Sequence, residues 1–221
     1  MGISNFQIPR VYPITDARIS GISHVEQVRR LIAGGATLIQ LREKHASPRE
    51  FLDAALNAVA VARENNVKII INDRVDIALV AEADGVHLGQ DDMPPERARE
   101  VLGSNAIIGF STHSVEQAQR ASEMPIDYLA IGPVFQTSTK ADPDPVIGLE
   151  GVSAVRASVG SLPLVAIGGI TASSALSVVA AGSDSVAMIS SVIGQPDAIT
   201  ETMNGLLRQL KLQTLFGEVK N

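Results

Sequence analysis

Residues 68–92 read KIIINDRVDIALVAEADGVHLGQDD, and they contain one complete strand–helix–strand unit. Two short, mainly apolar runs, 68–72 and 85–88, enclose a helical pattern near 75–81. A crossover of this kind joins strands that run in the same direction and places the helix on the outside of the sheet. The segment therefore predicts parallel β-structure.

The same alternation extends along the whole chain. Outside this segment, strands are expected at 11–15, 37–41, 106–110, 128–131, 164–167 and 185–189. Helices are expected near 24–34, 48–64, 95–102, 115–123, 150–159, 172–181 and 197–212. Eight strands, each followed by a helix, favour a closed barrel over an open doubly wound sheet, which usually has fewer strands. We predict an α/β fold, a single-domain (β/α)8 TIM barrel over residues 1–221, because no linker or shift in composition marks a second domain.

Two local signals refine this pattern. At the start of the helix near 48–64, Ser47, Pro48 and Glu50 provide an N-cap, a first-turn proline and a capping-box partner. The longest irregular stretch is 136–148, which contains two prolines. A loop of this length is often a lid or a binding loop.

Composition narrows the functional classes. The chain has 221 residues, of which 45% are hydrophobic and 19% charged, so it can bury a large core. With 18 basic and 24 acidic residues the net charge is −6, which argues against a nucleic-acid or general polyanion binder. The absence of cysteine excludes a disulfide scaffold, a thiolate metal site and a cysteine nucleophile.

The same inventory predicts a cytoplasmic protein with no membrane partner. Residues 1–15 lack the apolar region of a secretory signal. The segment 157–183 has no charged residue, but it contains a proline, several glycines and several serines and threonines. These residues would break or hydrate a membrane-spanning helix.

Polar residues gather at the ends of the expected strands. In a (β/α)8 barrel the carboxyl ends of all strands meet at one face, where the active sites of such barrels lie. Seven expected strands run into polar or glycine residues, at 40–44, 72–74, 87–92, 111–113, 137–140, 168–169 and 190–191. We therefore expect one functional site at this face.

A basic cluster follows the strand at 37–41. Gln40, Arg42 and Lys44 are spaced two residues apart, so the first two share a face of the strand and Lys44 follows on the loop. Pointing inward, they would form a cationic rim suited to phosphate or pyrophosphate. The alternative is that they are solvated loop charges paired with Glu43.

Asp73 and Asp92 follow two neighbouring strands and could together hold a divalent cation. Two hard oxygen ligands suit a Mg²⁺ ion that keeps its waters and shares phosphate oxygens of a substrate. The alternative is that each aspartate caps the helix that follows it, and spacing alone leaves both interpretations open. No histidine spacing indicates a metal site or a Ser–His–Asp triad, so His87 is interpreted as a strand histidine with satisfied ring nitrogens and His113 as a loop histidine.

A second anion site is expected at Gly168 and Gly169. They precede Thr171 at a helix start, where backbone N–H groups and the helix dipole face an anion. Barrels frequently bind phosphate at the loops after strands seven and eight, and Ser190 and Ser191 follow strand eight. Two anion sites in one barrel mouth predict two phosphorylated ligands, or one ligand with two phosphate ends.

Taken together, these strings resemble the thiamine phosphate synthase family. In chain order the similar segments are YPITD (12–16), QLREK (40–44), NDRVD (72–76), ADGVHLGQDD (83–92), STHS (111–114), GPVF (132–135), TSTK (137–140) and AIGGI (166–170). They extend over nearly the whole chain. The set is specific, although each segment alone is not.

The resemblance implies a (β/α)8 barrel and a transferase of thiamine biosynthesis. Members join hydroxymethylpyrimidine diphosphate to a thiazole phosphate, giving thiamine phosphate and pyrophosphate, so small molecules are the implied partners. Matched position by position, the residues implied to bind the pyrimidine substrate and its diphosphate are Gln40, Arg42, Lys44, Asn72, Ser111 and Lys140. Those implied to position the thiazole phosphate are Thr137, Thr139, Gly169, Ile189 and Ser190. Those implied to hold the Mg²⁺ cofactor are Asp73 and Asp92.

The implied mechanism is dissociative: pyrophosphate leaves first, and the thiazole nitrogen captures the pyrimidine methylene cation that results. Such a reaction needs stabilisation of the leaving group rather than a protein nucleophile. Arg42, Lys44 and Lys140 are the implied catalytic cations. The chain departs from the family pattern at Gln136, where proline is common, and at 190–192, where Val-Ser-Ala or Ile-Ser-Ala is more usual. Neither departure removes a charged or metal-binding group.

Two other functions stay open. A thiazole tautomerase on the same barrel would keep the glycine phosphate site and use His113 for proton transfer, but it would need neither the paired carboxylates nor the Arg42–Lys44 rim. A non-catalytic barrel that binds phosphorylated ligands is also compatible with the fold. The sequence predicts no oligomeric state.

Overall fold

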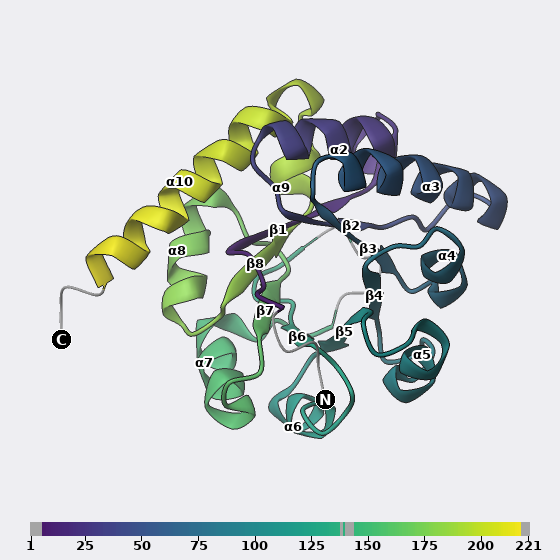
Figure 1. The fold of residues 1–221 in the computed structure, drawn as a ribbon. Helices are drawn as coiled ribbons and strands as arrows, with labels where there is room; N and C mark the ends of the chain where they lie inside the picture. Colours follow the sequence, from purple (N-terminus) through teal and green to yellow (C-terminus); the bar gives the residue numbers. More distant parts are fainter. Residues whose placement is uncertain (1–5, 138, 140–143, 218–221) are drawn as a thin grey trace.

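Eight parallel strands close into a barrel in the computed structural model, which describes residues 6–137, 139 and 144–217 (Figure 1). Neighbours in the barrel are neighbours in the chain, and β1 closes the barrel by pairing with β8. The strands are β1 (Val11–Thr15), β2 (Leu38–Leu41), β3 (Lys68–Asn72), β4 (Gly85–Leu88), β5 (Ile107–Thr112), β6 (Tyr128–Ile131), β7 (Leu164–Ile167) and β8 (Ser185–Met188). The predicted (β/α)8 barrel is confirmed.

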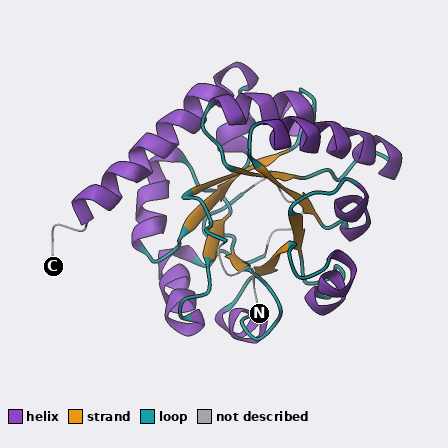
Figure 2. Cartoon of the chain, viewed as in Figure 1, coloured by secondary structure: helices purple, strands orange, loops and turns teal. Residues whose placement is uncertain are grey.

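Helices surround this barrel on its outer side (Figure 2). They are α1 (Ala17–Ser20), α2 (His24–Ala33), α3 (Pro48–Glu64), α4 (Val75–Val80), α5 (Pro95–Leu102), α6 (Val115–Ala121), α7 (Gly148–Val159), α8 (Ala172–Ala180), α9 (Ser190–Ile193), the 3-10 turn η1 (Pro196–Ala198) and α10 (Ile199–Gly217). All eight expected helices form. Helices α1 and α9 and the turn η1 are not predicted, because three or four residues are too few to show an apolar period.

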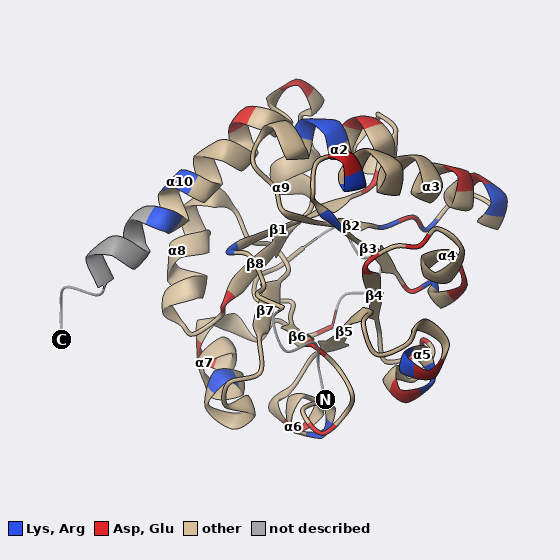
Figure 3. Cartoon of the chain, viewed as in Figure 1, with Lys and Arg blue, Asp and Glu red and all other residues tan. Residues whose placement is uncertain are grey.

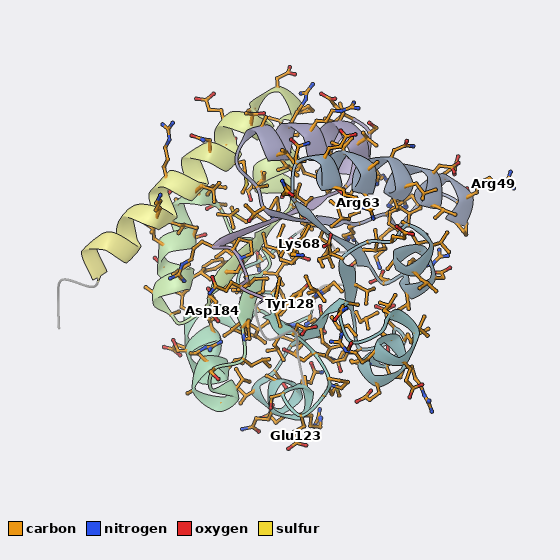
Figure 4. All side chains as sticks on the ribbon, viewed as in Figure 1. Arg49, Arg63, Lys68, Glu123, Tyr128 and Asp184 are labelled. Carbon is orange, nitrogen blue, oxygen red and sulfur yellow. The ribbon has the colours of Figure 1, made fainter. Side chains whose placement is uncertain are left out.

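Strand residues alternate between the barrel interior and the helical layer. On β1, Tyr12 and Ile14 belong to the inner apolar cluster, whereas Val11 packs with the helices. The other buried members of the inner cluster are Leu38, Ile70, Ile107, Tyr128, Ala130, Val165 and Ala187. Figure 4 shows Tyr128 inside the ring of strands. Charged residues lie mainly on the helices and loops, and most of the strand ribbon carries none (Figure 3).

One boundary matters for the site. The strand expected at 106–110 is Ile107–Thr112, so Ser111 belongs to β5 rather than to the following loop. Ser111 is four residues from Ile107, which faces the interior, and it therefore points to the same side. The strand thus delivers this hydroxyl into the barrel.

The larger apolar core lies between the strands and the helices. The capping box predicted at the start of α3 is confirmed, since Glu50 N donates to Ser47 Oγ at 3.3 Å and Ser47 N donates to Glu50 Oε2 at 2.8 Å. Such a cap stabilises a helix by about 1 kcal/mol. No helix in the described part of the chain is both long enough and apolar enough to cross a bilayer.

Candidate active site

A cavity of about 910 Å³ opens at the carboxyl ends of the strands. Its lining includes residues from all eight strands, and its volume is in the range of small-molecule sites, roughly 300–1,000 Å³. The lining brings together the following predicted site residues: Gln40, Arg42, Lys44, Asn72, Asp73, Asp92, Ser111, Thr137, Thr139, Gly169, Ile189 and Ser190. The one remaining predicted residue, Lys140, lies outside the described residues.

Arg42 is held in the cavity wall by Asp16. Arg42 Nη1 donates to Asp16 Oδ2, and the other carboxylate oxygen of Asp16 accepts from the backbone N–H groups of Arg18 and Ile19 at 3.0 and 3.1 Å. Asp16 is therefore both the N-cap of α1 and the ion-pair partner of Arg42. This pairing is not predicted from the sequence, since α1 itself is too short to leave a signal there.

Asp73 and Asp92 lie together beside Lys44. Lys44 Nζ donates to Asp73 Oδ2, and Asp73 lies close enough to Asp92 to act on its carboxyl group. Burial raises the pKa of Asp92; the N–H of Gly89, 2.7 Å from Asp92 Oδ2, opposes this shift, and the adjacent Asp73 adds to it. Neither aspartate occupies the N-cap of α4 or α5, so the capping interpretation is wrong. Two carboxylates instead share one corner of the cavity.

Glu43 does not pair with the neighbouring cations. Its carboxylate accepts from the backbone N–H groups of His45 and Ala46 at 2.7 and 3.1 Å and lies 3.2 Å from His24 Nε2. Burial alone would raise the pKa of Glu43, but these hydrogen bonds hold it at about 2. The solvated-pair interpretation of this segment is therefore wrong: Glu43 anchors the loop after β2, and aspartates hold both cations at the rim.

The loops after β7 and β8 build another wall of the cavity. Gly169 has a positive φ of 65°, and a Cβ there would lie 2.4 Å from the carbonyl oxygen of Gln136. Only glycine fits this turn without a shift of the backbone. Thr171 precedes α8, and Ser190 is the first residue of α9, so two helix starts line this wall. Glycine turns and helix starts of this kind can bind phosphate.

Five hydrogen-bonded side chains, which we call the floor chain, cross the inner end of the cavity. Gln40 Nε2 donates to Tyr12 Oη at 3.1 Å, and the hydroxyls of Tyr12 and Tyr128 are 3.0 Å apart. His87 Nδ1 lies 2.9 Å from Tyr128 Oη, and His87 Nε2 lies 2.8 Å from Ser111 Oγ. Burial lowers the pKa of His87 to about 4 and raises the pKa of both tyrosines. The imidazole is therefore neutral at pH 7.

Only part of the floor chain can be predicted from the sequence. The interpretation of His87 as a strand histidine with satisfied nitrogens is confirmed. Its contact with Ser111 is not predicted, because residues on different strands have no characteristic spacing. Tyr12 and Tyr128 are not identified either, although they are the only two tyrosines of the chain and both occupy inward positions on expected strands.

Comparison with known proteins shows the family of the chain. A family model described as thiamine monophosphate synthase matches residues 11–192. The chain belongs to this family. The thiamine-phosphate synthase of Chloroflexus aurantiacus is 46% identical over 198 residues, which cover 89% of this chain and 91% of that protein. That of Koribacter versatilis is 46% identical over 200 residues, covering 87% and 93%.

A solved structure agrees with the thiamine monophosphate synthase match. The thiamine phosphate pyrophosphorylase from Pyrococcus furiosus has a TM-score of 0.83 and 40% identity, over 92% of this chain and 96% of that chain. The family match also includes every segment that carries the sequence resemblance. The resemblance is therefore confirmed, and the chain is an enzyme of thiamine biosynthesis.

Proposed function

We propose that this enzyme joins hydroxymethylpyrimidine diphosphate to a thiazole phosphate, giving thiamine phosphate and pyrophosphate. The observation that carries the proposal is that one cavity has two walls suited to anions. One wall has Arg42, Lys44 and two aspartates, and the other has the Gly169 turn and two helix starts. A reaction between a diphosphate and a monophosphate needs both. The names of the relatives support the same reaction.

Asp73 and Asp92 fit a Mg²⁺ ion. Two carboxylates in contact repel each other when both are ionised, and a shared cation removes that repulsion. Within the described residues, no group of three or more His, Cys, Asp or Glu side chains could hold a metal. A two-carboxylate site suits Mg²⁺, which is usually bound through one or two carboxylates, waters and substrate phosphates. When bound there, the ion would supply positive charge for the departing pyrophosphate.

Arg42 and Lys44 stabilise the same leaving group. Negative charge grows on pyrophosphate as its bond to the pyrimidine methylene carbon breaks, so cations fixed in advance stabilise the transition state more than the ground state. Asp16 keeps the Arg42 guanidinium in the wall before substrate arrives. Lys140, assigned from its place in the TSTK segment, adds a third positive charge.

The remaining predicted residues bind and orient the two rings. Gln40, Asn72 and Ser111 bind the pyrimidine, and the residues that hold the thiazole phosphate are Thr137, Thr139, Gly169, Ile189 and Ser190. Holding both substrates in one cavity makes the attack of the thiazole nitrogen an oriented step. Ser111 is not a nucleophile in this scheme, since a neutral histidine with a pKa of about 4 is a weak base at pH 7.

The reaction itself is the test. Purified protein is incubated with both substrates, with Mg²⁺ or with a chelator, and thiamine phosphate and pyrophosphate are measured by mass spectrometry. We expect both products only when Mg²⁺ is present. Lys44→Met should abolish most of the turnover. Lys68→Met is its matched control, because Lys68 is also ion-paired with an aspartate but lies at the amino end of β3.

The outcomes separate the alternatives. Interconversion of thiazole tautomers without thiamine phosphate would assign the chain to the tautomerase function. Binding of both substrates without either reaction would indicate a phosphate-ligand binding barrel. Thiamine phosphate formed equally well in chelator would contradict the role of Mg²⁺ but leave the reaction intact.

A further inference from the structure

The floor chain is shielded from water along most of its length. Its members Gln40, Tyr12, Tyr128 and His87 are all buried, and only Ser111 at its end is partly exposed. The five residues come from five different strands of the barrel. Buried polar groups must find their hydrogen-bond partners within the protein, so each of these groups depends on its neighbours in the chain.

The packing leaves this arrangement little freedom. The Tyr128 ring stacks on His87 with centroids 5.5 Å apart and meets the Tyr12 ring edge-on at 5.9 Å. Gly109 on β5 provides the room for this ring, because a Cβ at that position would lie 2.0 Å from Tyr128 Cζ. The hydroxyl of Tyr128 is therefore held between Tyr12 and His87.

The Gln40 amide at one end of the floor chain bears on which group donates and which accepts in each of its hydrogen bonds. We call this donor-to-acceptor order the direction of the floor chain. Gln40 Nε2 can only donate, so Tyr12 accepts this bond. Tyr12 is buried and its hydroxyl also contacts Tyr128 Oη, so the arrangement that pairs its own buried proton has Tyr12 donating to Tyr128. Tyr128 then donates to His87 Nδ1, which leaves the single proton of the neutral imidazole on Nε2. His87 Nε2–H donates to Ser111 Oγ, and the Ser111 hydroxyl proton is left to point toward another acceptor.

We propose that Gln40 is the positioning residue that sets this direction, so that His87 is held as the Nε2–H tautomer and Ser111 is a hydrogen-bond donor to the substrate. The opposite direction is chemically possible, because each hydroxyl both donates and accepts and imidazole has two tautomers. It would require Gln40 to present its carbonyl oxygen to Tyr12, or the buried Tyr12 hydroxyl to accept from both Gln40 and Tyr128 and leave its own proton unpaired. Ser111 would then donate to His87 and offer only lone pairs to the cavity.

The direction of the floor chain determines which pyrimidine can pair with its two ends. This consequence rests on the proposed function. A ring nitrogen of a pyrimidine is an acceptor, so it pairs with a donating Ser111. Gln40 has given one amide proton to Tyr12 and retains its carbonyl oxygen, which accepts from an exocyclic amino group. An aminopyrimidine therefore matches the two ends of the floor chain, whereas the oxo analogue presents the reverse pattern of donors and acceptors.

Nitrogen NMR of the ligand-free protein tests the direction without the reaction. In protein labelled with 15N-histidine, two-bond proton–nitrogen correlation spectra show which ring nitrogen of each histidine carries a proton. Loss of one set of signals in His87→Gln assigns His87 among the four histidines. His113 is an internal reference, because its Nδ1 lies 2.7 Å from the carbonyl oxygen of Gly132, which can only accept. We expect the Nε2–H tautomer for His87 in the wild type.

Variants at the two ends of the floor chain test whether Gln40 or Ser111 determines the tautomer of His87. Gln40→Met removes the amide at nearly constant length, and we expect both His87 nitrogen signals to move toward the average of the two tautomers. Gln40→Asn, which withdraws the amide from Tyr12, should do the same and serves if the first variant does not fold. Ser111→Ala is the matched control, and it should leave His87 as Nε2–H.

Three results would overturn the proposal: a wild-type His87 protonated at Nδ1, an unchanged His87 in the folded Gln40 variants, or a shift in Ser111→Ala as large as that in Gln40→Met. None of these spectra requires substrate. A failure here therefore differs from a failure of the proposed reaction, which the product assay detects.

Discussion

The carboxylate of Asp16 accepts from the guanidinium of Arg42 and caps helix α1 at the same time. The pair joins the segment after β1 to the segment after β2. Asp16 is 7% exposed and Arg42 17%, so water screens the interaction far less than it screens an ion pair on the outer helices. The position of a cavity cation therefore depends on a helix outside the barrel.

Asp16→Asn should separate the two roles of this side chain. Asparagine caps helices about as well as aspartate, so α1 should remain, but the charge that holds Arg42 is lost. Hydrogen bonds between charged groups contribute about 1.5–3 kcal/mol, which predicts a fall in kcat/KM for the diphosphate substrate of roughly 10- to 100-fold. Steady-state kinetics measure it. Glu82→Gln, which breaks an exposed pair with Arg63, is the control, and an equal effect there would contradict the prediction.

Removing either carboxylate of the aspartate pair should weaken the response to Mg²⁺. For Asp73→Asn and Asp92→Asn we expect turnover to fall by roughly 10²–10³-fold, the range seen when one charge-stabilising group is removed from an active site. The Mg²⁺ concentration for half-maximal rate should also rise. Initial rates across a MgCl₂ titration measure both effects. Asp91→Asn should behave like the wild type. A larger loss of turnover in Asp91→Asn than in Asp92→Asn would show that Asp91, and not Asp92, is the ligand.

Lys140→Ala should lower turnover with little effect on folding. Lys140 lies outside the described residues, so this prediction rests on its place in the TSTK segment. We expect a decrease in kcat of roughly 10²–10³-fold, because a cation that stabilises the leaving group acts mainly in the transition state. The kcat value and the urea midpoint are measured on the same preparation. Normal turnover, or a protein that does not fold, would count against the role.

Gly169→Ala should weaken binding of the thiazole phosphate, an effect that the strain of a positive φ alone would not produce. The new Cβ would lie 2.4 Å from Gln136 O and 2.8 Å from Phe135 Cβ, so the turn after β7 must move. Gly21 is the matched control, since it has a positive φ of 73° but nothing within 4 Å of an added Cβ. Gly21→Ala should cost about 1–2 kcal/mol of stability and leave KM for the thiazole phosphate unchanged. In Gly169→Ala we expect that KM to rise at least about tenfold, roughly 1.4 kcal/mol of binding energy; equal effects in both variants would refute this.

Glu43→Gln should reduce stability at neutral pH and much less in acid. The pKa of Glu43 is about 2 in the folded protein, below its ordinary value of 4.5, so its carboxylate stabilises the fold above pH 4.5. That contribution is lost as the pH falls from 4.5 to 2. At pH 7 we expect a loss of about 1.5–3 kcal/mol from the free energy of unfolding, the range for hydrogen bonds to charged groups. Urea unfolding of both proteins between pH 3 and pH 7 measures the difference, and a difference that does not narrow toward pH 3 would contradict the assignment. Glu64→Gln, on the exposed end of α3, should match the wild type throughout.

Much of the fold could be predicted because its signals are local. The change in apolar period indicates the strand–helix–strand unit at 68–92, and the four residues of the capping box that begins at Ser47 indicate a helix start. The four-residue helices α1 and α9 contain too few residues for such a signal. The end of β5 could not be placed either, because Ser111 and Thr112 are held there by pairing with Ala130 and Ile131 on β6.

By itself, the sequence determined the barrel, the face where the site lies and the chemical types of the residues gathered there. Parallel strands end at one face, so polar residues after each strand must meet. The tertiary structure decided the partners: Arg42 with Asp16, Asp73 with Asp92, and His87 between Tyr128 and Ser111. These contacts join side chains from different strands and loops. Their geometry follows from closure of the barrel and the stagger of its strands, and no spacing along the chain records either.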